Sequence, residues 1–216
     1  MIITIDGQSG TGKSTLANIL AKKLNYKCLN TGMIYRAITY YFLKNDILPD
    51  NLDEINIKLA SMNIVLSFVD HSQFVKINYI DITPFVSIQD VQKFVSDYSQ
   101  VLSIREKVTD IQRDFAKNNN IVVEGRDIGT HVFPYADYKF FVSCDINVRA
   151  NRRLQDLIKL GQKVTLTEVI ESLNKRDYLD STRKYSPLKK AEDAIVIDTS
   201  YKTIDESISE ILSYIK

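Results

Sequence analysis

The sequence predicts an α/β fold, in which one parallel β-sheet is covered by helices on both faces. Short apolar runs alternate along the chain with longer helical patterns, and the runs lack the period-two alternation of half-exposed strands. The chain has 216 residues, of which 44% are hydrophobic and 25% charged. A chain of this size and composition favours one globular domain spanning residues 1–216.

The elements follow in order along the chain. Five apolar runs are predicted as buried strands: Ile2–Asp6, Tyr26–Leu29, Ile121–Glu124, Tyr138–Ser143 and Ala194–Asp198. The flanking patterns predict helices over Lys13–Leu24, Met33–Lys44, Ile146–Leu160, Leu166–Arg183 and Ile204–Ile215.

The stretch from Met62 to Phe85 interrupts this alternation. It holds three short β-rich pieces with turn residues between them: Ile64–Val69, Phe74–Ile77 and Tyr79–Ile82. Strands joined by tight turns are antiparallel, so we expect a small inserted sheet here. Helices are expected to follow over Ile88–Val101 and Ser103–Lys117. The lobe is expected to cover about residues 62–105.

Charge and cysteine content exclude several classes of protein. The 28 basic and 27 acidic residues leave a net charge of +1, which argues against binding nucleic acid or a membrane surface through a general basic field. Cys28 and Cys144 are far apart and lie in apolar runs, so we expect buried free thiols. The N-terminus does not resemble a signal peptide, and no apolar run reaches the ~18 residues of a transmembrane helix. We expect a cytoplasmic protein.

Residues 7–14, GQSGTGKS, match the phosphate-loop pattern G-x-x-x-x-G-K-[ST] between a predicted strand and a predicted helix. Glycines allow backbone N–H groups to converge on phosphate oxygens at the helix N-terminus. Lys13 is expected to reach the β- and γ-phosphates, and the Ser14 hydroxyl to ligate Mg²⁺. The predicted ATP-binding residues are Gly7, Gln8, Ser9, Gly10, Thr11, Gly12, Lys13, Ser14 and Thr15.

A GTPase switch is disfavoured by two observations. Residues 174–177, NKRD, match a guanine-reading motif, but they lie within a helical pattern instead of after a strand. None of the seven glycines has an aspartate three positions before it, so the D-x-x-G element is absent from the sequence.

Arginines predict a second anion site. The chain has nine arginines and nineteen lysines, so arginine positions favour sites that need a planar, bidentate donor. Arg36 and Arg126 each follow a predicted strand, at the sheet edge where open α/β sheets bind ligands. Arg176, Asp180 and Arg183 are spaced to share one helical face. Two anion-binding regions predict phosphoryl transfer to an acceptor that already carries a phosphate.

Five stretches carry a resemblance to the bacterial cytidylate kinase family over nearly the whole chain: Ile5–Thr15, Asn30–Ala37, Val122–Pro134, Arg176–Leu188 and Ala191–Ser200. The GRDIGT and RDYLDSTRKYSPL pieces are the most specific of them. The resemblance implies a P-loop NTPase core, an inserted acceptor-binding lobe and a short lid over about residues 149–165. It also implies transfer of the γ-phosphoryl group of ATP to CMP or dCMP.

The resemblance further implies roles for individual residues. Thr31, Arg36, Arg126 and Arg183 match residues that hold the acceptor phosphate. Ser96, Arg105 and Asp127 match those that read cytosine, and Arg176 and Asp180 match those at the ribose. Asp127 can accept a hydrogen bond from the cytosine amine and Arg105 can donate to the ring acceptors. Asn30 stands where the family usually has an acidic residue, which removes a charge near the acceptor phosphate.

The remaining expectations concern catalysis. The acceptor is already an anion, so positioning and electrostatics through Lys13, Mg²⁺ and arginines are expected to suffice. Arg126 and Arg183 are candidates, and so are the predicted lid arginines Arg149, Arg152 and Arg153, with no choice made among those three. Kinases of another nucleoside monophosphate, such as UMP, and a non-catalytic P-loop switch remain the alternatives. We expect a monomer.

Overall fold

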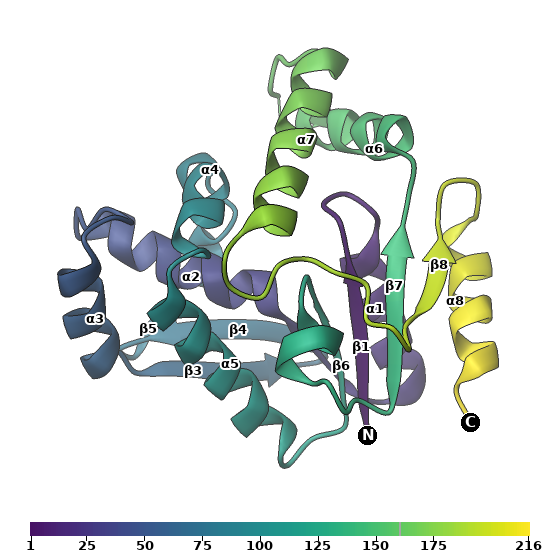
Figure 1. Cartoon of the computed structure of the whole chain (residues 1–216), viewed down its shortest axis with the longest axis horizontal. Helices are drawn as coiled ribbons and strands as arrows, with labels where there is room; N and C mark the ends of the chain where they lie inside the picture. Colours follow the sequence, from purple (N-terminus) through teal and green to yellow (C-terminus); the bar gives the residue numbers. More distant parts are fainter. Residues whose placement is uncertain (160) are drawn as a thin grey trace.

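The computed structural model describes residues 1–159 and 161–216. A five-stranded parallel sheet lies at its centre, with strand order β2-β6-β1-β7-β8 (Figure 1). The strands are β1 (Ile2–Gly7), β2 (Lys27–Asn30), β6 (Ile121–Gly125), β7 (Tyr138–Ser143) and β8 (Ile195–Asp198). All five predicted strands are confirmed, within one or two residues at their ends.

Eight α-helices surround the sheet and the inserted lobe in the described part of the chain: α1 (Lys13–Leu24), α2 (Thr31–Lys44), α3 (Leu52–Ser61), α4 (Gln89–Tyr98), α5 (Leu102–Ala116), α6 (Ile146–Lys159), α7 (Leu166–Thr182) and α8 (Ile204–Tyr214). The helix predicted over Ile146–Leu160 is described to Lys159, and Leu160 lies outside the described residues. α3 has no counterpart among the predicted helices. Asn51 caps it by accepting the Glu54 N–H, and this short polar side chain was its signal.

Both faces of the sheet are covered, as predicted. On β6, Val122 packs into one apolar cluster with α1 and α8, while Ile121 and Val123 pack into the other with α2 and α5. Neighbouring strand residues point to opposite faces, so this alternation places a core on each side of the strand. The strand is buried on both faces, which explains its continuous apolar sequence.

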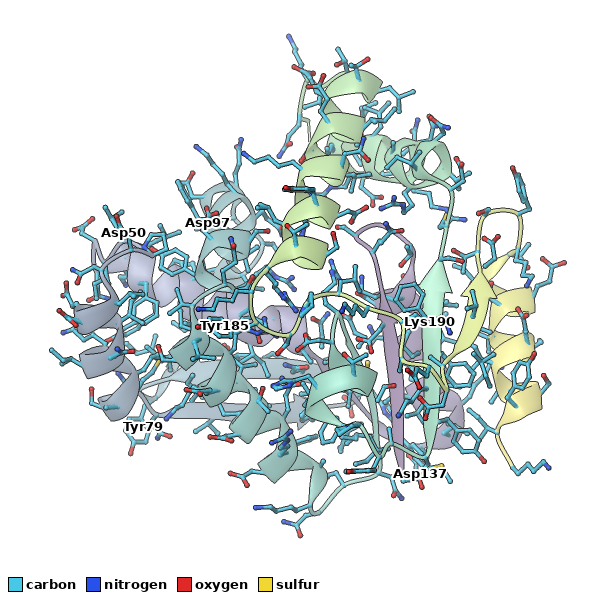
Figure 2. All side chains as sticks on the ribbon, in the orientation of Figure 1. Asp50, Tyr79, Asp97, Asp137, Tyr185 and Lys190 are labelled. Carbon is cyan, nitrogen blue, oxygen red and sulfur yellow. The ribbon has the colours of Figure 1, made fainter. Side chains whose placement is uncertain are left out.

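The predicted antiparallel insert is confirmed and consists of β3 (Ile64–Val69), β4 (Ser72–Ile77) and β5 (Ile80–Asp81), in that order. Each turn has two residues with positive φ, Asp70–His71 and Asn78–Tyr79, the conformation that joins strands tightly. Tyr79 lies exposed at the second turn (Figure 2). Val75 and Ile77 of β4 belong to the same cluster as α2 and β6, so the lobe shares the core of the sheet.

α6 and α7 pack against each other above the carboxyl ends of the strands (Figure 1). They bury a small apolar cluster of their own, centred on Ala150, Val169 and Leu173. A capping box of Thr165 and Glu168 begins α7. α7 ends at Thr182, one residue before the predicted end, because Arg183 takes an extended conformation.

No helix among residues 1–159 and 161–216 is long and apolar enough to cross a membrane.

Candidate functional site

The phosphate loop connects β1 to α1. Gly7 has φ +154 and its added Cβ would lie 2.3 Å from the Val142 carbonyl oxygen, so only glycine fits this approach to β7. Of the nine predicted donor residues, six line cavities: Ser9, Gly10, Gly12, Lys13, Ser14 and Thr15. The other three shape the loop. Thr11 Oγ1 donates to the Gln8 carbonyl oxygen at 3.1 Å, for example.

Lys13 is buried at the base of this loop, and its Nζ donates to the Gln8 carbonyl oxygen at 3.0 Å. Burial and the positive charge of Arg126 lower the pKa of Lys13 to about 7. A lysine without a carboxylate partner in such a position favours an anion as its missing counter-charge. The geometry therefore fits a phosphate group in the loop.

Nucleotide binding should accordingly take up a proton at Lys13. Above pH 7 the free ammonium loses its proton, and a bound polyphosphate raises its pKa again. At pH 8 we expect uptake of about one proton, and affinity for ADP should fall as pH rises above 7. Calorimetric titrations with ADP in buffers of different ionisation enthalpy measure this uptake. Binding heats that do not depend on the buffer would contradict it, and Lys13→Met should remove the dependence.

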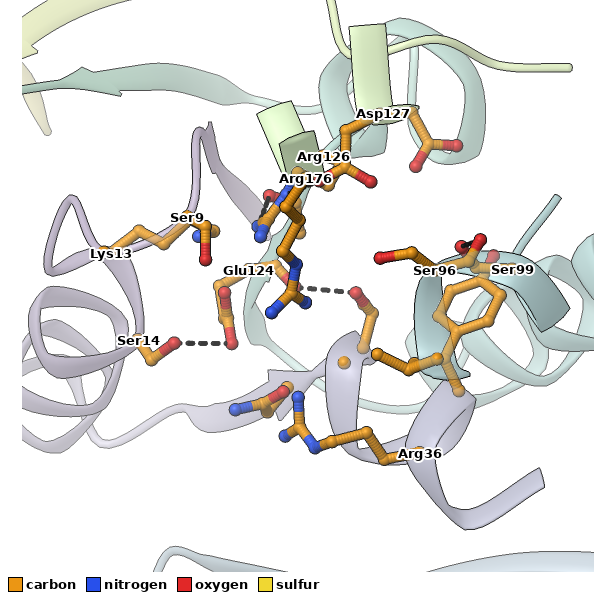
Figure 3. A pocket seen from close by; sticks show the side chains of 18 of the residues that line it. Ser9, Lys13, Ser14, Arg36, Ser96, Ser99, Glu124, Arg126, Asp127 and Arg176 are labelled. Atoms are coloured by element: carbon orange, nitrogen blue, oxygen red, sulfur yellow. Dashed lines mark hydrogen bonds and ion pairs between the residues drawn. The ribbon is translucent and has the colours of Figure 1, made fainter. Parts of the chain in front are cut away.

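Ser14 faces Glu124, which lies near the carboxyl end of β6. The Ser14 hydroxyl donates to Glu124 Oε1 at 2.8 Å, and both residues line the same cavity (Figure 3). These are the hard oxygen ligands that Mg²⁺ prefers, and Mg²⁺ normally adds substrate phosphates and water to one or two protein groups. No cluster of three or more His, Cys, Asp or Glu side chains that could hold a metal ion occurs in the described residues. Sequence reasoning missed Glu124, although an acidic residue ending a strand beside the phosphate-loop strand was a usable signal.

The predicted acceptor residues meet around a cavity of about 270 Å³ that also borders the phosphate loop (Figure 3). Eight of the nine line it: Thr31, Arg36, Ser96, Arg126, Asp127, Arg176, Asp180 and Arg183. Arg105 is the ninth, and it lies behind Asp127 instead. Ser9, Gly10, Lys13 and Ser14 form the opposite wall. Donor loop and acceptor residues therefore share one space.

A network of buried ion pairs organises this wall. Asp127 accepts from Arg105 Nη2 at 2.5 Å and from Arg183 Nη2 at 3.0 Å. Asp180 accepts from Arg126 Nε at 2.7 Å and lies 3.7 Å from Arg183 Nη1. Burial opposes ionisation of Asp180, but the charges of Arg126 and Arg176 lower its pKa below the usual value. The aspartates thus hold three arginines in fixed orientations.

Two further arginines in the cavity lack such partners. The Nε atoms of Arg36 and Arg176 are buried and have no hydrogen-bond partner within the described part of the chain. Burial and the charge of Arg126 lower the pKa of Arg176 to about 10. Buried guanidinium groups with unused donors favour a bound anion. The unused donors of this cavity match the chemistry of an anionic ligand.

Arg183 owes its orientation to the connection after α7. Its Nε and Nη2 donate to the Ser186 carbonyl oxygen at 2.8 and 2.6 Å. Ser186 has a positive φ of 46, which turns that carbonyl toward the guanidinium. The contact uses the backbone, so it does not depend on the Ser186 side chain.

Asn30 stands at the start of α2, on the acceptor side. Its side chain accepts the Met33 N–H at 3.0 Å and so caps the helix. Its backbone exchanges hydrogen bonds with the Gln73 side chain of β4, at 2.7 and 3.3 Å. The amide thus retains the capping function of an acidic side chain, but it places no negative charge beside Arg36.

Tyr35 is a second residue that sequence reasoning missed. It lines the acceptor cavity, and the Arg105 guanidinium lies 5.7 Å from its ring centre. Burial raises the pKa of its hydroxyl to about 12, although the charge of Arg105 opposes this. It lies on α2 one residue before Arg36, and helix packing alone explains an aromatic residue there, so the sequence pattern did not single it out.

Asp6 joins the two halves of the site. It lies on β1 directly before the phosphate loop, and its carboxylate accepts the N–H groups of Ile128 and Gly129 at 2.9 and 2.7 Å. Those residues begin the π-helical turn Ile128–Val132, which follows Arg126 and Asp127. Burial raises the pKa of Asp6 to about 7, although the two N–H groups oppose this. The loop after β6 is therefore anchored to β1.

The three predicted lid arginines have different surroundings. Arg149 is buried, pairs with Asp177 of α7 and borders neither cavity. Arg152 borders the larger cavity of about 730 Å³ and donates to the Thr199 carbonyl oxygen at 2.8 Å. Arg153 borders both cavities, and no hydrogen bond or ion pair joins its side chain to the rest of the described chain. Only Arg153 therefore combines a free guanidinium with access to both cavities.

A strand–phosphate loop–helix unit facing an arginine-lined cavity defines a P-loop phosphotransferase. The sequence matches the cytidylate kinase family over residues 3–216. A cytidylate kinase of Clostridium botulinum strain Langeland is 41% identical over 214 residues, covering 99% of this chain and 97% of the relative. One of Fusobacterium nucleatum is 39% identical over 211 residues, covering 98% and 95%. The chain belongs to the cytidylate kinase family.

The fold also resembles a solved structure. An uncharacterized protein from Eubacterium ventriosum superposes with a TM-score of 0.57 at 15% identity, covering 100% of this chain and 97% of the other. At this identity the likeness concerns the fold alone.

Proposed function

We propose that this protein transfers the γ-phosphoryl group of ATP to CMP or dCMP, giving ADP and CDP or dCDP. Its membership of the cytidylate kinase family supports this reaction. The observation that carries it in the structure is the shared cavity, in which Lys13 and Ser14 face Arg36, Arg126 and Arg176. Both phosphate-bearing substrates would meet there.

The donor is assigned to the phosphate loop and the larger cavity. Lys13 neutralises the β- and γ-phosphates, and the loop N–H groups bind their oxygens. Ser14 would hold Mg²⁺, with Glu124 as the neighbouring carboxylate. When bound, the ion would neutralise negative charge on the phosphate groups of the donor.

The acceptor is assigned to the arginine-lined cavity. Arg36, Arg126 and Arg183 bind its phosphate together with Thr31, whose hydroxyl donates to the Glu124 carbonyl oxygen at 2.9 Å. Asp180 and Arg176 are assigned to the ribose. Asp127, Arg105 and Ser96 are assigned to cytosine. Asp127 already accepts from two arginines, but a carboxylate has about four acceptor positions, so room remains for the cytosine amine.

The reaction then needs alignment more than proton transfer. An oxygen of the acceptor's α-phosphate attacks the γ-phosphorus, and the bond from that phosphorus to the β-phosphate oxygen breaks. The nucleophile is already an anion, so no general base is required. Charge on the transferred group is stabilised by Lys13, Arg126 and Arg153.

The remaining assignments follow from this reaction. Residues 62–105 form the acceptor-binding lobe, and residues 149–165 form the lid that brings Arg153 over the donor. We propose that the enzyme is cytoplasmic and acts as a monomer.

An acceptor panel tests the proposal. Purified protein with ATP and Mg²⁺ is offered CMP, dCMP, UMP, AMP and GMP, and ADP formation is followed. We expect turnover with CMP or dCMP and much weaker turnover with UMP, because uracil places a carbonyl against the Asp127 carboxylate. Equal turnover of UMP or AMP would overturn the cytosine assignment. ATP binding without acceptor-dependent ADP formation would favour a non-catalytic switch.

A further inference from the structure

The peptide units on both sides of Ser9, within the phosphate loop, are held by side chains from distant helices. The Ser9 N–H donates to Asp177 Oδ1 of α7 at 3.2 Å. The Ser9 carbonyl oxygen accepts from Arg149 Nη1 of α6 at 3.0 Å. Arg149 and Asp177 are themselves joined by an ion pair of 2.5 Å. Three segments far apart in the sequence therefore meet at one residue of the loop.

The guanidinium of Arg149 is held in place by several hydrogen bonds. Its Nε also donates to the Cys144 carbonyl oxygen at 3.2 Å, so one guanidinium serves three acceptors. Arg149 and Asp177 are 4% and 8% exposed. If Arg149 moved to a phosphate, it would leave a buried carboxylate unpaired, which is strongly unfavourable. This speaks for Arg153, and against Arg149, as the arginine that reaches the transferred group.

The hydrogen bond from Arg149 to the Ser9 carbonyl oxygen also orients the N–H group of Gly10. In a trans peptide the C=O and the following N–H point in opposite directions. Arg149 therefore turns the Gly10 N–H away from itself, and Gly10 lines both cavities. Gly10 has φ +77 and could adopt other conformations freely. If the peptide between Ser9 and Gly10 rotated, the Ser9 carbonyl oxygen would face the phosphate in place of the Gly10 N–H.

We propose that Arg149 and Asp177 are positioning residues that fix the peptides around Ser9, so that the Gly10 N–H is directed at the donor phosphates before nucleotide binds. This inference rests on the proposed donor site. It assigns Arg149 to the orientation of the loop and not to contact with substrate. The pair acts through the peptides around Ser9, on the wall of the shared cavity opposite the acceptor residues, so it should affect donor binding selectively.

Separate titrations with ADP plus Mg²⁺ and with CMP test the pair. Asp177→Asn keeps the shape of the side chain but removes its charge, and Arg149→Lys keeps a charge but removes the three-way contact. Each should weaken ADP binding about tenfold and leave CMP binding within about twofold. The double variant should bind ADP no more weakly than either single variant, because the two residues act as one unit.

Asp193→Asn is the matched control. It breaks the Lys139–Asp193 ion pair of 2.8 Å, which lies outside the site, and should leave both titrations unchanged. Unchanged ADP binding in Asp177→Asn and Arg149→Lys would overturn the proposal. So would equal weakening of ADP and CMP in step with a lower Tm, or additive losses in the double variant. The ADP titration needs no turnover, so it would remain valid if the acceptor panel identified another nucleotide.

Discussion

Replacement of Lys13 by methionine should lower kcat by about a thousandfold. Methionine fills the buried volume without the ammonium that faces the phosphate loop, and no other lysine lines the acceptor cavity in the described chain. The charge that develops on the transferred phosphoryl group would then lose its nearest fixed counter-charge. Steady-state rates with saturating ATP and CMP measure the effect.

CMP binding provides the internal control for Lys13→Met. The acceptor residues do not hydrogen-bond to Lys13, so the Kd for CMP should stay within about threefold. Removing a buried cation that has no carboxylate hydrogen-bonded to it should not lower the Tm. If the variant retained a tenth of the wild-type kcat, the conclusion would be that Lys13 does not stabilise the transition state.

The Asp127→Asn variant should lose the ability to distinguish CMP from UMP. Asparagine replaces one acceptor oxygen by a donor, which no longer matches the cytosine amine and faces Arg105 or Arg183. We expect kcat/KM for CMP to fall about a hundredfold or more, with UMP much less affected. Competition between the two acceptors in one assay gives the ratio directly.

The loss of specificity in Asp127→Asn can be distinguished from a general loss of stability. Asp127 pairs with two buried arginines, so Asp127→Asn should also lower the free energy of unfolding, by about 3 kcal/mol. The specificity claim concerns only the ratio of the two acceptors, which partial unfolding leaves unchanged. An Asp127→Asn enzyme with the wild-type CMP to UMP ratio would place cytosine recognition elsewhere.

Much of the fold could be predicted from the sequence because its strands are continuous apolar runs with turn residues between them. Ile121–Gly125 is buried on both faces, and this gave it an unmistakable pattern. α3 escaped prediction since only two of its ten residues, Ile55 and Leu59, are buried. The π-helical turn Ile128–Val132 also escaped prediction, because the N–H groups of its first two residues donate to the carboxylate of Asp6, 122 positions before Ile128.

The site was predictable where residue type alone carried the chemistry. Eight of the nine predicted acceptor residues line one cavity. Four of them, Thr31, Arg36, Arg126 and Asp127, follow the neighbouring parallel strands β2 and β6, whose carboxyl ends meet at one sheet edge. The other four come from α4 and from the C-terminal end of α7. The surroundings of Arg149 could not be predicted in the same way. Its sequence neighbours resemble those of Arg153, and only the packing of α6 on α7 buries one guanidinium and leaves the other free.

The anchoring of the β6 loop by Asp6 bears on how closely the two substrates can be aligned. In-line transfer requires the reacting atoms within about 3–3.5 Å of each other, and an error of 1 Å is costly. β1 leads directly into the loop for one substrate and, through Asp6, fixes the loop for the other. The rigid sheet thus fixes the distance between the two loops that bind the phosphates. We expect closure of the lid proposed over residues 149–165 to exclude water without having to set that spacing.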